Sequence, residues 1–168
     1  GVRRELGELN DVMAEIVELA TDSHQPPELI PVDLAPIVEQ VSARFVRRTG
    51  RSLDANIEPI RVRGDADSLA RATTNLLSNA DKYSPEGAPV RIEAGPGGVF
   101  VDDAGPGIPP NERRAVLERF YRRVEDRSKP GSGLGLSIVA SIVEQHGGQV
   151  IVTDSELGGA RVGFRLPN

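Results

Sequence analysis

The 168-residue chain contains no cysteine and no tryptophan, and it has only two histidines. Without cysteine there is no disulfide and no thiolate metal site, so any bound metal must be a hard ion held by oxygen, such as Mg²⁺. Four Phe and two Tyr offer few rings that could stack on bases, and the net charge is −5. This composition argues against a nucleic-acid partner.

Long apolar runs are also missing. No segment approaches the roughly 20 apolar residues of a membrane span, and the opening residues GVRRELGELN lack the apolar block of a signal peptide. We therefore expect no membrane contact from this piece of chain. Its length suits one domain with one core and a short appendage.

The first 22 residues carry apolar side chains at alternating spacings of four and three, which is typical of a coiled coil or helix bundle. The repeat consists of Val2, Leu6, Leu9, Met13, Ile16 and Ala20. A single amphipathic helix packed on its own domain is the alternative. Residues 23–31 are rich in proline and polar side chains, which predicts a linker.

Residues 32–168 contain helices and antiparallel strands in separate groups. Helices are predicted after Asp33, which can act as an N-cap, from about Asp67 to Tyr83, and after GSGLGLS up to Gly147. Two hairpins are predicted, VRIEAG with VFVDD and QVIVTDS with ARVGFRLP, beside the strand-like pieces SLDANI and IRVRG. This order predicts an α+β fold, a two-layer sandwich with one mixed, mostly antiparallel sheet covered by helices.

The predicted long helix has a polar face. Asn75 and Asn79 lie one turn apart, and Lys82 and Tyr83 follow at the next turn. A solvated surface is the simple interpretation, since amides are common there. Amide oxygens and an ammonium group also suit a hydrated cation and a polyphosphate.

Two glycine-rich segments are further candidates for a binding site. In DDAGPGIPP, Asp103 ends a strand and can accept a hydrogen bond from an exocyclic amine, while the glycines let backbone approach a flat ring. A simple turn is the alternative. GSGLGLS opens a helix whose N-terminal amides suit phosphate, but its spacing is neither the dinucleotide fingerprint nor a Walker A sequence.

Taken in order, NLLSNADKY, DAGPGI, RFYR and GSGLGLS closely resemble the N, G1, F and G2 boxes of a known family. The family is the ATP-binding catalytic domain of bacterial two-component sensor histidine kinases, within the GHKL superfamily. The resemblance covers residues 32–168 and implies the Bergerat-type ATP-binding fold. Residues 1–22 resemble the last part of the family's dimerisation and phosphoacceptor helix.

The resemblance implies a role for each motif residue. Asp103 takes the adenine amino group, Asn79 ligates Mg²⁺, and Asn75 orders ligand or water beside it. Lys82 reaches a phosphate, and Tyr83 packs near the adenine or ribose. Asn75 and Lys82 are thus the candidate catalytic residues.

The other boxes imply further ATP contacts and a lid from Pro110 to Pro130. These contacts are Gly105 and Gly107 in the floor of the base pocket, Phe120 and Arg122 in the lid, and Gly131, Gly133, Leu134 and Gly135 at the phosphates. Asp102 precedes Asp103 and is expected to point to the other side of the strand as a structural residue.

In this family Mg-ATP donates its γ-phosphate to a histidine of the dimerisation domain for relay to a response regulator. The parent protein implied is a homodimeric membrane sensor whose kinase domain is cytoplasmic. Because Pro26 and Pro27 follow His24 and exclude a helix interior there, His24 is not the expected acceptor. His146 is expected to interact with the dipole of a helix C-terminus. This chain is therefore not expected to phosphorylate itself.

Alternatives stay open at this point. Related ATPases that hydrolyse ATP use a Glu at the position of Asn75, and an amide cannot act as that base. Anti-sigma-factor serine kinases share the fold, but that reading leaves the repeat in residues 1–22 unexplained. A purely partner-binding module would show no saturable nucleotide binding.

Overall fold

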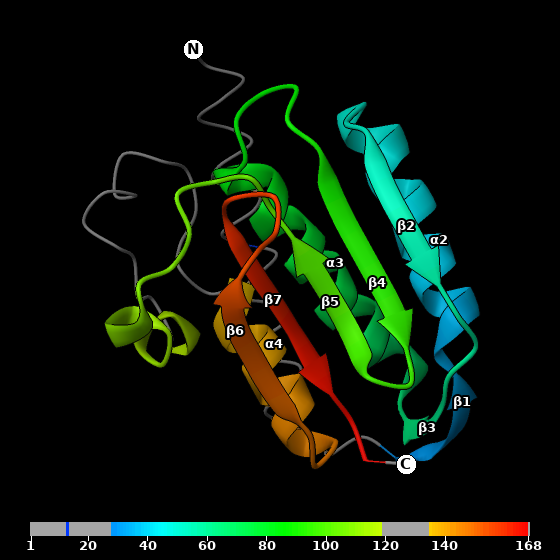
Figure 1. Cartoon of the computed structure of the whole chain (residues 1–168). Helices are drawn as coiled ribbons and strands as arrows, with labels where there is room; N and C mark the ends of the chain where they lie inside the picture. Colours follow the sequence, from blue (N-terminus) through cyan, green and yellow to red (C-terminus); the bar gives the residue numbers. More distant parts are fainter. Residues whose placement is uncertain (1–12, 14–27, 119–134, 168) are drawn as a thin grey trace.

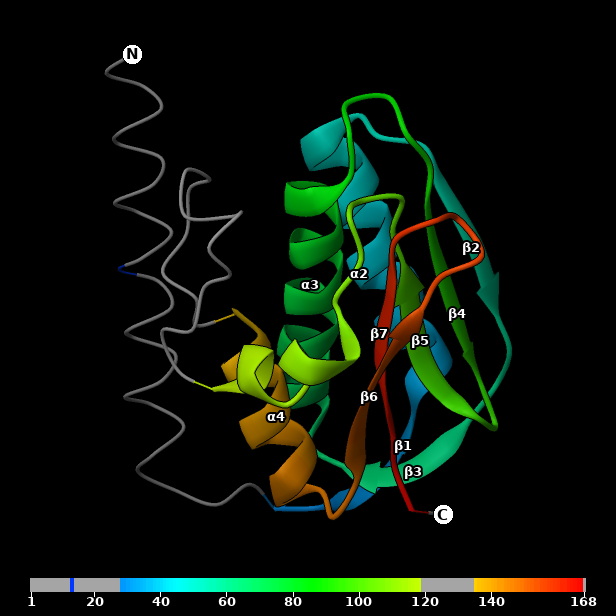
Figure 2. The ribbon, with the colours of Figure 1, turned by 60° about the vertical axis from the view of Figure 1, so that its left-hand side comes forward.

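The computed structural model describes residue 13, residues 28–118 and residues 135–167. One large sheet forms the first layer, and helices α2, α3 and α4 cover one of its faces as the second (Figure 1, Figure 2). Among the described residues, no helix is long and apolar enough to cross a bilayer. The predicted two-layer α+β architecture is confirmed.

The large sheet has five strands in the order β2-β4-β5-β7-β6. β2 (Leu53–Ile57) pairs in parallel with β4 (Val90–Gly95). The other pairings are antiparallel and join β4 to β5 (Gly98–Asp102), β5 to β7 (Ala160–Arg165), and β7 to β6 (Gln149–Asp154). Both predicted hairpins and the mixed sheet are therefore present.

A second, two-stranded sheet differs from the prediction. β1 (Ile30–Asp33) pairs antiparallel with β3 (Arg61–Gly64), so the end of the proposed linker 23–31 is a strand. The short segment IPVD has no usable periodicity, and Pro31 lowers its strand propensity. Its conformation depends on pairing with a partner some 30 positions away, as the register of Pro31 with Arg63 shows.

The helices begin and end close to the predicted positions. α2 (Leu34–Thr49) is capped by Asp33, whose carboxylate accepts from the Ala35 N–H at 3.1 Å. α3 spans Ala66–Tyr83, and α4 spans Gly135–Gln145. Gly147 follows α4 with a positive φ of 72°, as expected for a residue that ends a helix. Two short 3-10 turns, η1 (Pro110–Glu112) and η2 (Ala115–Leu117), lie between β5 and α4.

The core lies between the helices and the sheet, with α2 packed behind β2 and β4, α3 behind β5, and α4 behind β6. On α3 the buried residues include Leu76, Leu77 and Ala80, each at most 2% exposed. Burial of this apolar face fixes the rotation of α3 about its own axis. Its polar face, with Asn75 and Asn79, is consequently turned away from the core.

His146 joins α3 to α4, which refines the predicted role of this residue. Its Nδ1 lies 2.7 Å from the Ile142 carbonyl, and its Nε2 accepts from the Asp65 N–H at 3.0 Å. Because Asp65 supplies a proton donor, the buried ring is neutral with its proton on Nδ1. It therefore bonds the end of α4 by a neutral hydrogen bond and also fixes the N-cap of α3.

Candidate functional site

Asp103 lies directly after β5 and is 4% exposed. Its Oδ1 accepts two backbone hydrogen bonds, from Gly105 at 3.0 Å and from Ala160 at 2.9 Å. The Asp103 and Ala160 backbones are also joined, since the Asp103 N–H donates to the Ala160 carbonyl at 2.9 Å. Both side-chain hydrogen bonds end on Oδ1, so the carboxylate is held in one orientation.

Burial raises the pKa of Asp103 above the ordinary value for an aspartate. The backbone N–H groups of Ala160 and Gly105 act in the opposite direction, and the neighbouring charge of Asp102 adds to the increase. A carboxylate in such an environment accepts strongly from a ligand because water competes little for it.

Two close contacts hold the Asp103 loop, one against the end of α3 and one against the turn before β7. A Cβ at Gly105 would lie 2.5 Å from the Tyr83 carbonyl oxygen, and one at Gly159 would lie 2.1 Å from Asp103 Oδ1. Only glycine allows either approach. Ser84 adds a hydrogen bond, with its Oγ accepting from the Ala104 N–H at 3.2 Å.

The sequence analysis missed Gly159 and Ala160. The Gly159 N–H donates to the Asp103 carbonyl at 3.1 Å, while Ala160 holds the carboxylate. The signal was the pair of glycines that immediately precedes the last strand, in ELGGARV. From the sequence alone these two glycines predict only an ordinary turn, because the pairing of β5 with β7 is not evident there.

The predicted polar residues share one half-buried side of α3. Asn75 Nδ2 donates to the carbonyl of Gly135, the first residue of α4, at 3.3 Å. Asn75 therefore holds the start of α4 beside α3, a contact that the sequence did not predict. Lys82 Nζ lies 5.8 Å from the centroid of the Tyr83 ring. No hydrogen bond between described residues occupies the side-chain amide of Asn79.

Arg51 organises the end of α3 and was also missed. Its Nε pairs with Asp81 Oδ1 at 2.8 Å, and the Arg51 side chain is only 11% exposed. The remaining guanidinium hydrogens reach backbone carbonyls, which are those of Asp81, Ser84, Pro85 and Ala88. These carbonyls belong to the last turn of α3 and to the loop after it, so Arg51 fixes the backbone that carries Lys82 and Tyr83.

Replacement of Arg51 by Met is expected to lower the free energy of unfolding by about 1–3 kcal/mol, since several carbonyls lose a charged donor. Asp81→Asn is the matched control. It removes one partly exposed ion pair but keeps the carbonyl contacts, so its cost should stay within about 1 kcal/mol. Urea denaturation of both variants measures the difference. Equal losses would mean that the ion pair, and not the carbonyl cluster, carries the stability.

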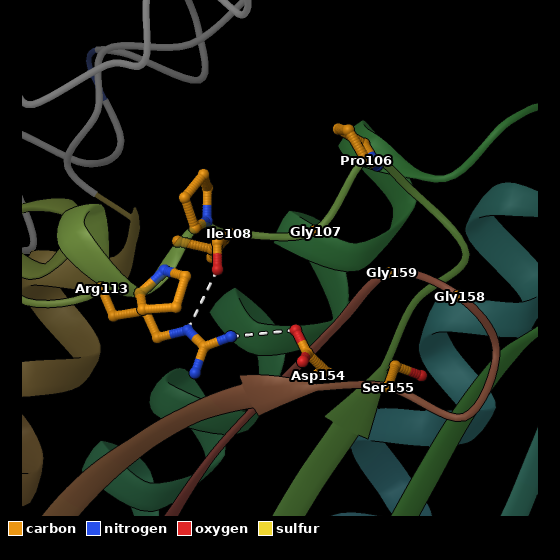
Figure 3. Close-up of a pocket in the computed structure, with 10 residues that line it drawn as sticks. Pro106, Gly107, Ile108, Arg113, Asp154, Ser155, Gly158 and Gly159 are labelled. Carbon is orange, nitrogen blue, oxygen red and sulfur yellow. Dashed lines mark hydrogen bonds and ion pairs between the residues drawn. The ribbon is translucent and has the colours of Figure 1, made fainter.

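An open pocket of about 240 Å³ borders the Asp103 loop on the side of β6 (Figure 3). It is lined by residues 106–110, Arg113, and residues 154–155 and 158–159. Arg113 crosses it, donating from Nε to the Ile108 carbonyl at 3.0 Å and from Nη2 to Asp154 at 2.9 Å. These bonds attach the first part of the predicted lid to the G1 loop and to the end of β6.

The structure brings the end of α3 at Tyr83 against the loop of Asp103 and Gly105, and Asn75 against the start of α4. Asn79 and Lys82 lie between these two contacts, on the same half-buried side of α3. Asp102 points to the opposite face of β5 and pairs with Arg161, in agreement with its expected structural role. Several predicted residues lie outside the described part of the chain, namely Phe120, Arg122, Gly131, Gly133 and Leu134. His24 and, apart from Met13, the apolar repeat of residues 1–22 also lie outside it.

Residues 64–168 match the protein family described as "Histidine kinase-, DNA gyrase B-, and HSP90-like ATPase". The chain belongs to this ATPase family. The match spans α3, the Asp103 loop, α4 and the last hairpin, and therefore every site residue described above except Arg51.

Within this ATPase family the chain is similar to protein-histidine kinases. It is 40% identical over 164 residues to the signal transduction histidine-protein kinase/phosphatase MprB of Mycobacterium avium (strain 104), covering 94% of this chain and 31% of that protein. The chain thus spans about a third of the relative's length. A solved structure of the mycobacterial sensor histidine kinase MprB aligns with a TM-score of 0.72 and 38% identity, covering 83% of this chain and 97% of that one.

The ATP-binding domain of PrrB from Mycobacterium tuberculosis aligns with a TM-score of 0.64 and 30% identity, covering 84% of this chain and 98% of that one. The chain is accordingly the ATPase domain of a sensor histidine kinase, an enzyme domain with the fold expected from its motifs.

Proposed function

We propose that this domain binds Mg-ATP and donates the γ-phosphate to a histidine on the dimerisation domain of its parent kinase. The observation that carries the proposal is the buried Asp103 carboxylate, held by two backbone N–H groups beside the polar side of α3. Its oxygen can accept a hydrogen bond from the exocyclic amine of adenine. Guanine carries a carbonyl oxygen at that position, and two acceptors cannot form a hydrogen bond.

The phosphates and the metal are assigned to α3. Asn79 offers an amide oxygen, which is a suitable ligand for Mg²⁺, and Lys82 supplies a cation one turn away. The described residues contain no group of three or more His, Asp or Glu that could hold a metal by itself. This fits a Mg²⁺ ion that is bound by few protein ligands together with the ATP phosphates.

The remaining contacts follow from the backbone arrangement. Gly105 and Gly107 form the floor of the base pocket, and Tyr83, whose carbonyl packs on Gly105, flanks the adenine or ribose. Gly135 opens α4, whose N-terminal amides would face the phosphates together with Gly131, Gly133 and Leu134. Phe120 and Arg122 would contribute from the lid, residues 110–130.

Asn75 favours a kinase over a hydrolysing ATPase. A base that activates water needs a carboxylate at this place, whereas Asn75 donates its amide to Gly135. Transfer to a serine of a partner protein is the second candidate, supported by the same nucleotide site. The similarity to MprB, which extends over 94% of this chain, favours a histidine as the acceptor.

The wider assignments rest on the same similarity. The parent protein would be a homodimeric sensor of the cell membrane with this domain in the cytoplasm. Its phosphorylated histidine would pass the phosphate to a response regulator. The domain itself would bind neither nucleic acid nor membrane.

Isothermal titration of the chain with ATP and with GTP, each with and without MgCl₂, tests the proposal. We expect saturable ATP binding that Mg²⁺ strengthens, and GTP binding at least about 10-fold weaker because of the mismatched acceptors. Incubation with γ-labelled ATP should leave this chain unlabelled. Acid-labile label on His24, or equal affinity for both nucleotides, would contradict the assignment.

A further inference from the structure

An ion pair lies on the opposite face of the sheet from the Asp103 carboxylate. It takes no part in the ATP contacts proposed above. The Asp102 side chain is 2% exposed, and its Oδ2 lies 2.6 Å from Arg161 Nη1. Arg161 also bonds Glu93 at 3.0 Å and places its guanidinium 4.6 Å from the centroid of the Phe100 ring. The pair is therefore held from three strands, β4, β5 and β7.

Its place in the ladder connects it to the site. Asp102 is the last residue of β5 and stands opposite Arg161, the second residue of β7. One position further along the ladder, Asp103 stands opposite Ala160. The Asp103 N–H donates to the Ala160 carbonyl, and the Ala160 N–H donates to Asp103 Oδ1 and so orients the carboxylate. The ion pair thus joins β5 to β7 at the ladder position directly before Asp103 and Ala160.

We propose that Asp102 and Arg161 are a positioning pair for Asp103, one that keeps β5 and β7 closed so that Ala160 holds the carboxylate toward adenine. This inference rests on the proposed ATP binding and extends it to the outer face of the sheet. Neither residue touches the ligand, because alternate residues of a strand end on opposite faces.

The charge of Asp102 also acts on Asp103, since it raises the pKa of that carboxyl. The other charged groups facing Asp102 are Arg91 and Glu93 from β4 and Arg161 from β7. On its own side, Asp103 faces the end of α3 at Tyr83 and the turn at Gly159. Asp102→Asn keeps an oxygen acceptor for Arg161 but removes the charge, so it should lower the pKa of Asp103.

Arg161→Leu tests the positioning, with Arg165→Leu as the matched control. Both arginines lie on the same face of β7 and near the same ring, with Arg165 6.0 Å from the Phe100 centroid. Removing Arg161 should weaken ATP binding by about 3- to 10-fold, as for the disturbance of one hydrogen bond. Arg165→Leu should bind ATP as the wild type does. Equal effects of the two substitutions would overturn the positioning pair.

Asp102→Asn provides the second readout and does not depend on Arg161→Leu being able to fold. ATP affinity is measured by titration from neutral to acidic pH, where protonation of Asp103 removes its accepting charge. The variant should keep its affinity to a lower pH than the wild type, because the neighbouring charge that raises the pKa of Asp103 is gone while the contact with Arg161 is kept. An unchanged or higher midpoint would overturn the inference. Absence of ATP binding by the wild type would instead overturn the proposed function.

Discussion

Asp103→Asn is expected to weaken ATP binding by about 10- to 150-fold, the loss of roughly 1.5–3 kcal/mol from a hydrogen bond to a charged group. The geometry supports a specific effect of this substitution. An Asn oxygen can still accept from Gly105 and Ala160 in the place of Oδ1. The substitution therefore changes mainly the second atom of the group, which we propose accepts from the adenine. Isothermal titration with ATP measures the loss.

The same substitution should leave the free domain as stable as the wild type or more stable. Because the pKa of Asp103 is raised in the folded state, its ionised form lowers the free energy of unfolding at neutral pH. That penalty is present above the folded pKa and disappears as the pH falls from there toward the ordinary aspartate value. Asn, which carries no charge, avoids the penalty at every pH.

Thermal denaturation at neutral and acidic pH checks this, with Asp54→Asn as the control. Asp54 is a carboxylate whose side chain is 70% exposed at the edge of the sheet, so its replacement should change neither binding nor stability. If Asp103→Asn bound ATP as the wild type does, the adenine assignment would be wrong. If it unfolded, the carboxylate would be a structural group.

Asn79→Ala is expected to abolish Mg²⁺-dependent phosphotransfer in the parent kinase and to spare the binding of adenosine. An amide oxygen that ligates the metal stabilises the nucleotide only through its phosphates. The loss in affinity should therefore grow with the number of phosphates, reaching at least about 10-fold for Mg-ATP, in the range seen when metal-site residues are removed. Titration of this chain with adenosine, AMP, ADP and ATP in MgCl₂ measures the series.

Asn56→Ala is the matched control, because Asn56 is an exposed amide on β2. It should leave the whole nucleotide series unchanged. Equal weakening of adenosine and ATP by Asn79→Ala would show that Asn79 supports the pocket structurally and does not serve the metal.

Local patterns in the sequence were sufficient for most of the fold. The Asp33 cap, the apolar face of α3 and the two hairpins were all predicted, because each depends on residues that are neighbours in the chain or lie one helical turn apart. The order of four short motifs identified the family for the same reason. Each motif is a short segment of the chain, so its polar residues and glycines recur at short, fixed spacings.

The sequence by itself thus determined the elements, the family and the position of Asp103 at the end of a strand. The tertiary structure alone decided which groups hold that carboxylate and the end of α3. Ala160 reaches Asp103 from 57 residues away, and Arg51 reaches Asp81 from 30. Such contacts leave no periodic signal, since they depend on strand order and on backbone carbonyls that every residue possesses. They become visible only when the sheet and helices are packed together.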